Sequence, residues 1–141
     1  MIKDRYIKEY SISAFKFYSH YGSLDGYKKS LYNEWTKNNL GLDDVYFNSY
    51  YSSKKAEIYD IESVDNTIQE LSLMGRNDII KALDIVYLSS PVSKNDTVSM
   101  RVTRASLNLY VSESSIYNYI SKAIEIFAIK RGLRFCYSKN I

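Results

Sequence analysis

The chain has 141 residues, of which 45% are hydrophobic and 25% charged, proportions typical of a globular domain. A single Cys136 and a single His20 exclude an internal disulfide and fall short of the ligands that a zinc site needs. No apolar run reaches the roughly 18 residues of a membrane span, and we recognise no secretory leader, so we expect a cytoplasmic protein without metal, cofactor or membrane contact.

The net charge of +3 is distributed unevenly. Residues 98–141 contain seven Lys and Arg against two Glu, a net charge of +5, whereas residues 1–97 carry −2. A basic end on a near-neutral body favours a polyanionic partner, because displaced phosphate counterions supply affinity that does not depend on sequence. Basic chain ends also serve solubility, so charge alone does not distinguish these two interpretations.

The N-terminal part predicts two helices. Apolar spacing favours a first helix over residues 5–18 and a second over residues 25–36. In the second, Tyr27, Leu31 and Trp35 follow one another at four-residue spacing and share one face.

Residues 38–53 mix Gly, Asn, Asp, Ser and Tyr, and this composition predicts a linker with at most a short helical turn. The segment also contains four clustered aromatic residues, Tyr46, Phe47, Tyr50 and Tyr51. Packing against the N-terminal helices suits this cluster better than contact with a partner protein or stacking on single-stranded nucleic acid.

An amphipathic helix is expected over residues 54–73. Ile61, Val64, Ile68 and Leu71 repeat at intervals of three and four, with polar residues between them. The repeat covers fewer than two heptads, which is too short for a coiled-coil seam. We therefore expect this apolar face in the core.

A further helix should follow a chain reversal. Gly75 suits the position after a helix end, and Asn77 can cap the next helix, which should stop before Pro91. Residues 89–97 are polar and predict a surface loop.

Helical periodicity dominates, since only one Pro and five Gly interrupt the chain and strand alternation is essentially absent. We therefore expect an all-α helical bundle. Its expected parts are an N-terminal helical pair (1–37), a linker (38–53), a C-terminal DNA-binding domain (54–135) and a tail (136–141).

The DNA-binding assignment depends on residues 98–134, which fit a helix-turn-helix, two helices joined by a tight turn. Ser106 is the small residue at which the helices can cross. Leu109 and Val111 flank the turn as apolar plugs. Ser112 is a good N-cap, because its hydroxyl can accept a hydrogen bond from an amide two or three residues later.

The second helix of this unit predicts a buried stripe and a polar face. The stripe positions lie within about 100° of one another on an ideal helix, and they are Ile116, Ile120, Ala123, Ile124 and Phe127. The polar positions carry side chains that can bond to base edges, namely Glu113, Ser114, Ser115, Asn118, Ser121 and Lys122. The cations expected to contact phosphates are Arg101, Arg104, Lys130, Arg131 and Arg134.

Tyr110 departs from the usual pattern, because it occupies the turn position where Gly is common and φ is often positive. A bulky residue there costs roughly 1 kcal/mol. A surrounding core that fixes the turn can sustain such a cost.

The residues over 79–133 also resemble a known family. The most telling parts are Val86-Tyr87-Leu88, the segment SESSIYNYI and Arg131-Gly132-Leu133. They resemble phage late-gene regulators of the Q-like antiterminator and ArpU type, whose C-terminal helix-turn-helix is similar to region four of bacterial sigma factors. The resemblance implies binding to double-stranded DNA near a promoter, with RNA polymerase as partner. Some late antiterminators also carry a cysteine zinc motif, which this chain lacks.

Enzymatic motifs are missing from the sequence, which contains neither a GxxxxGK[ST] phosphate loop nor an HExxH metal motif. The helix-turn-helix pattern predicts a non-enzymatic, sequence-specific DNA-binding protein, and the resemblance implies a transcription regulator of a phage or mobile-element operon that acts with RNA polymerase as activator or antiterminator. Three alternatives stand beside it: a sigma-like factor, a DNA-packaging or excision adaptor, and a protein-binding helical module.

Overall fold

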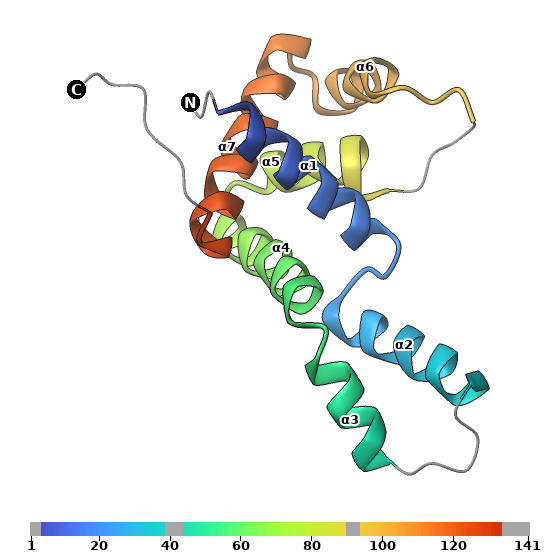
Figure 1. Cartoon of the computed structure of the whole chain (residues 1–141). Coiled ribbons are helices and arrows are strands. Elements are labelled where there is room, and N and C mark those ends of the chain that lie inside the picture. The colour runs from blue at the N-terminus through green and yellow to red at the C-terminus, as the bar shows by residue number, and fades with distance from the viewer. Residues whose placement is uncertain (1–3, 39–43, 90–93, 134–141) are drawn as a thin grey trace.

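The computed structural model describes residues 4–38, 44–89 and 94–133. These residues form an all-α fold without any strand, as the periodicity predicts (Figure 1). The elements are α1 (Arg5–Ser19), α2 (Leu24–Asn38), α3 (Asp44–Ser52), α4 (Lys55–Leu73), α5 (Asn77–Leu83), the π-helical segment η1 (Asp84–Leu88), α6 (Val98–Leu109) and α7 (Glu113–Arg131). In the described part of the chain, no helix combines the length and the apolar character that crossing a membrane requires.

The core forms where α7 packs against α1, α4, α5 and α6. The apolar face of α4 is buried through Ile61, Val64 and Leu71, which confirms its assignment to the core. Phe127 of α7 is fully buried and meets Phe15 of α1 edge to face, with ring centroids 5.4 Å apart. Burial of side chains of this size supplies most of the favourable free energy of such a fold.

Hydroxyl groups of three tyrosines attach the N-terminal helices to the acidic side of α4. In α1, Tyr10 donates to Asp60 at 2.6 Å, and Tyr18 donates to Asp65 at 2.5 Å. In α2, Tyr27 donates to Glu57. Burial, followed by the adjacent carboxylate, raises the pKa of both Tyr18 and Tyr27. These neutral phenols therefore act as fixed hydrogen-bond donors in the fold.

Residues 44–52 of the segment expected to be a linker form a helix instead. α3 covers nine residues, and its Phe47 is buried against Tyr32 and Trp35 of α2, with ring centroids 5.0 and 5.6 Å away. This apolar contact explains why a composition typical of loops folds as a helix. The aromatic cluster packs against an N-terminal helix, as expected. α2 and α3 lie at the end of the molecule opposite α6 (Figure 1).

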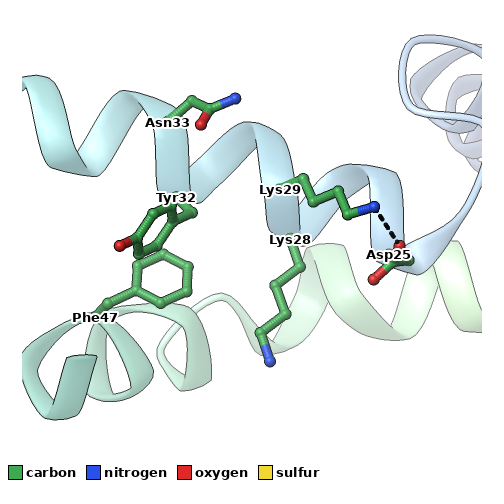
Figure 2. A pocket seen from close by; sticks show the side chains of 6 residues that line it. All are labelled: Asp25, Lys28, Lys29, Tyr32, Asn33 and Phe47. Carbon is green, nitrogen blue, oxygen red and sulfur yellow. Dashed lines mark ion pairs between the residues drawn. The ribbon is translucent and has the colours of Figure 1, made fainter.

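A shallow pocket lies between these two helices (Figure 2). Its charged groups already have partners within the pair, since Lys29 pairs with Asp25 at 3.1 Å and the Lys28 ammonium lies 5.0 Å from the ring centre of Tyr51. The pocket is therefore part of the packing between α2 and α3.

The link between α4 and α5 follows the expected chain reversal, with one correction. Gly75 has φ 72°, its amide donates to the Ser72 carbonyl, and the Arg76 amide donates to the Leu71 carbonyl, which completes a Schellman motif. Asn77 is the first residue of α5 and not its N-cap. The preceding Arg76 holds that position without a side-chain cap, and Asp78 accepts from the amide of Ile79 instead.

Candidate functional site

The turn between α6 and α7 is fixed by its own backbone and by two serines. α6 ends at Leu109, and Tyr110 adopts a left-handed conformation with φ 57° and ψ 42°, which confirms the positive φ expected there. The Ser106 hydroxyl donates to the Val111 carbonyl at 2.5 Å, and the Val111 amide donates back to the Ser106 carbonyl at 3.2 Å. Ser106 therefore closes the turn by hydrogen bonding.

Ser112 caps α7, as the sequence predicts. Its hydroxyl accepts from the amide of Ser115 at 3.1 Å and lies 3.0 Å from the Ser115 hydroxyl. The hydroxyl of Ser115 therefore faces the cap, whereas Ser114 is exposed. Thr97 caps α6 in the same way, by accepting from the amide of Met100.

α7 has the two faces that its periodicity predicts. The buried stripe consists of Ile116, Ile120, Ala123, Ile124 and Phe127, none more than 5% exposed. On the other side, Glu113, Ser114 and Asn118 are exposed, and Ser121 and Lys122 are half-buried. The helix thus gathers these candidate base-reading side chains on the outer side of its N-terminal half, while its inner side holds it to the core.

Tyr117 also belongs to this outer side and is missing from the sequence prediction. It is exposed and lies three residues after Ser114 and four before Ser121, so it shares their helical face. That spacing was the available signal.

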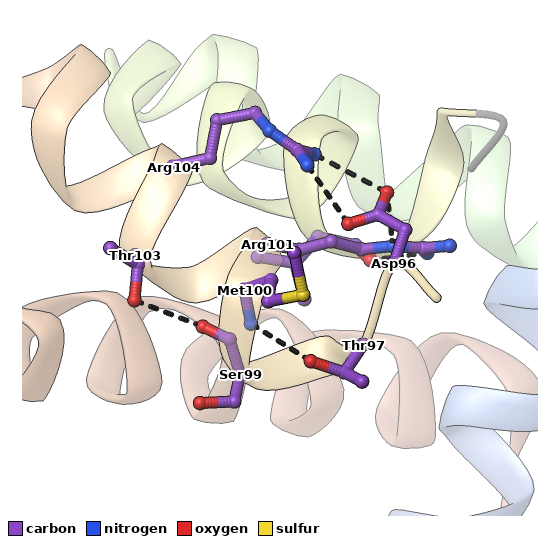
Figure 3. Close-up of polar contacts among 8 residues, drawn as sticks. Asp96, Thr97, Ser99, Met100, Arg101, Thr103 and Arg104 are labelled. Carbon is purple, nitrogen blue, oxygen red and sulfur yellow. Dashed lines mark hydrogen bonds and ion pairs between the residues drawn. The ribbon is translucent and has the colours of Figure 1, made fainter. Parts of the chain in front are cut away.

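The two arginines of α6 converge on one carboxylate (Figure 3). Arg101 lies 3.3 Å and Arg104 2.8 Å from Asp96, and Arg101 also donates to the Val86 carbonyl at 3.0 Å. The Asp96 side chain is only 1% exposed, whereas Lys94, Asn95 and Thr97 around it are exposed, as expected for a surface loop. Arg101 is mostly buried, whereas 42% of the Arg104 side chain remains accessible.

The cations at the C-terminal end of α7 face the body of the protein. Arg131 pairs with Asp60 at 2.7 Å, and Lys130 pairs with Glu70 at 3.0 Å, so both attach α7 to α4. The Arg131 guanidinium also lies over the rings of Tyr10 and Tyr59. These two residues are not brought together with the polar face of the N-terminal half. Arg134 lies outside the described residues.

The ion pairs show how many cations of α6 and α7 remain available to a partner. Of the five described cations in α6 and α7, Lys122 alone makes no ion pair. The other four are matched by three acidic residues from the first 97 positions, Asp60, Glu70 and Asp96. Most of the described positive charge of α6 and α7 is thus paired with acidic side chains.

α6 and the turn after it also expose three large apolar or aromatic side chains. Leu107 of α6 is 72% exposed and Tyr110 of the turn is 94% exposed, and Met100 is exposed two helical turns before Leu107.

Among the residues that the structure describes, no group of His, Cys, Asp and Glu could hold a metal ion. Comparisons with protein-family models, with curated proteins and with solved structures find no match for this chain.

Proposed function

We propose that α6 and α7 act as a helix-turn-helix that docks on double-stranded DNA, and that the protein is a sequence-specific transcription regulator of a phage or mobile-element operon. The observation that carries this proposal is the N-terminal half of α7. It follows a tight, hydrogen-bonded turn, its apolar side is buried, and its outer side presents Ser114, Asn118 and Lys122.

The dimensions and side-chain chemistry of α7 suit the major groove. An α-helix about 10–12 Å across fits a groove about 12 Å wide, and a short side chain reaches a base edge only when the helix backbone comes close. Asn118 can bond bidentately to adenine, and Ser114 can bond to a base or a phosphate. Glu113, in the first turn, can accept from cytosine.

Few residues remain for phosphate contact. Lys122 has no competing ion pair among the described residues, and 42% of the Arg104 side chain remains accessible beside its carboxylate partner. We assign Arg101, Lys130 and Arg131 to holding the fold together, because each is paired with an acidic side chain. Each phosphate neutralised adds about 0.9 to the steepness of the salt dependence, so these described residues should add only about two.

RNA polymerase is the proposed partner, with activation or antitermination as the outcome, on the basis of the resemblance to phage late-gene regulators. Co-purification with core RNA polymerase, together with a footprint of the protein on DNA upstream of its own gene, tests this part. A sigma-like factor would direct initiation by core polymerase without another sigma factor. A regulator would require one.

Replacement of Asn118 tests the recognition surface. Asn118→Ala should cost roughly 1–3 kcal/mol of discrimination between the preferred sequence and its variants. Asn66→Ala is the matched control, because Asn66 is also exposed but lies on α4. Selection of bound duplexes from a random library, followed by competition titration, measures the effect. Unaltered discrimination by Asn118→Ala would contradict the assignment of α7 as the recognition helix.

The second candidate is a protein-binding helical module, and the exposed Met100 and Leu107 together with the neutralised arginines favour it. The salt dependence of DNA binding separates the two candidates. A DNA-binding protein loses affinity steeply as salt rises, whereas a protein-binding module has no salt-sensitive affinity for duplex DNA.

A further inference from the structure

The turn before α7 contains an unusual residue for its conformation. Tyr110 is the only non-glycine with a positive φ among the described residues. The three other positive φ values belong to Gly22, Gly75 and Gly132. The left-handed conformation strains a residue with a side chain and does not strain glycine.

The fold makes little use of the Tyr110 side chain. The residue is 94% exposed, more than any other large hydrophobic residue described. The turn is held by the Tyr110 backbone amide, which donates to the Ser106 carbonyl, and by the bonds between Ser106 and Val111. A glycine could make the same backbone bonds. The tyrosine therefore destabilises the turn, and no hydrogen bond or packing of its side chain with the described residues offsets this strain.

We propose that Tyr110 contacts the sugar-phosphate backbone of DNA at the edge of the groove that α7 enters, an inference that rests on the proposed function. Tyr110 lies three residues before Glu113, the first residue of α7, so it stands beside the end of the helix that approaches the bases. At that edge the neighbouring surface is a phosphate strand. A phenol fits it, because its ring can cover a sugar and its hydroxyl can donate to a phosphate oxygen.

This contact has a signature that differs from those of the other DNA-facing residues. Tyr110 is neutral, so it releases no counterion and leaves the salt slope unchanged. It touches the backbone, so it adds affinity for every sequence alike. Lys122 should change the salt slope and Asn118 the discrimination, whereas Tyr110 should change neither.

The single variant Tyr110→Gly tests the proposal through two measurements, thermal unfolding and DNA affinity. Removal of the backbone strain should raise the midpoint of thermal unfolding by about 2–5 °C. Loss of the phenol should weaken binding about tenfold, both to a duplex of mixed sequence and to the selected duplex. Tyr110→Phe keeps the strain and the ring, so its midpoint should stay unchanged while its affinity falls about threefold. Tyr46→Ala, at an exposed tyrosine of α3, should leave the affinity unchanged.

Three outcomes would overturn the proposal. A stabilised Tyr110→Gly variant that binds duplex DNA like the unchanged protein removes the contact and leaves the proposed function standing. A loss of affinity accompanied by a shallower salt slope shows that the substitution displaced cations instead. An unchanged protein without salt-sensitive affinity for duplex DNA refutes the proposed function and this inference together.

Discussion

The two ends of α7 differ in how their polar side chains are used. At the C-terminal end, Lys130 and Arg131 pair with carboxylates of α4, and Tyr10 shares the Asp60 acceptor with Arg131. At the N-terminal end, Ser114 and Asn118 point away from the core and are exposed. Lys130 and Arg131 thus hold the second half of α7 to α4, whereas the first half, although buried on its inner side, presents Ser114 and Asn118 to the outside.

The difference shows which polar groups the fold needs. In the part of the chain that the structure describes, no buried side-chain nitrogen or oxygen lacks a hydrogen-bond partner. A polar residue that the fold needs is therefore found in a bond, as Asp60 and Asp96 are. The polar residues left outside such bonds are those available to a partner. Four substitutions or conditions can test this division.

The largest expected effect is the loss of Asp60, the shared acceptor. Asp60→Ala leaves Arg131 and Tyr10 without their partner and should lower the free energy of unfolding by about 2–4 kcal/mol. Urea denaturation measures the change. The double substitution Asp60→Leu with Arg131→Met removes both charges and should recover most of the stability. If Asp60→Ala denatures at the same urea concentration as the unchanged protein, the pair contributes nothing and the division between the two ends is wrong.

A second effect concerns alkaline pH. The ordinary pKa of Tyr18 and Tyr27 is 10.0, and burial beside a carboxylate raises both in the folded state. Above about pH 10 the unfolded chain loses these protons while the folded chain retains them, so stability should fall as pH rises from there. Denaturation midpoints at a series of pH values would show the decline. The variant combining Tyr18→Phe with Tyr27→Phe should show a smaller decline, and an equal one would exclude these two phenols as its source.

A smaller effect is expected at the turn. Ser112→Ala removes the cap of α7 and should cost about 1 kcal/mol of stability. Ser112→Gly should cost only a few tenths. Thermal unfolding followed by circular dichroism distinguishes the two variants. Equal midpoints for Ser112→Ala and the unchanged protein would mean that the hydrogen bond to the Ser115 amide contributes nothing to the start of the helix.

The smallest effect on stability should come from Lys122, which nevertheless matters most for the comparison. Lys122→Ala should leave the unfolding midpoint nearly unchanged and make the salt slope of DNA binding shallower by about one. Lys130→Ala, on the same helix, should leave the slope unchanged because Lys130 faces Glu70. Identical slopes for the two variants would contradict the difference between the ends of α7.

Much of the fold follows from local pattern. The bounds of α1, α2 and α4, the buried stripe of α7, the Ser112 cap and the positive φ at Tyr110 were all predictable, because each depends on residues within a few positions of one another. α3 was not predictable, because its nine residues become helical through contact between Phe47 and the aromatic side chains of α2.

The sequence by itself determined the all-α class and the composition of the outer side of α7, since helical periodicity fixes which side chains share a face. Only the tertiary structure decided which charges remain available. Asp60 and Arg131 are separated by 71 residues in sequence and by 2.7 Å in space, and no count along the chain could pair them. Ion pairing of this kind depends on packing between elements far apart in the sequence, and among the described cations of α6 and α7 it leaves only Lys122 outside an ion pair.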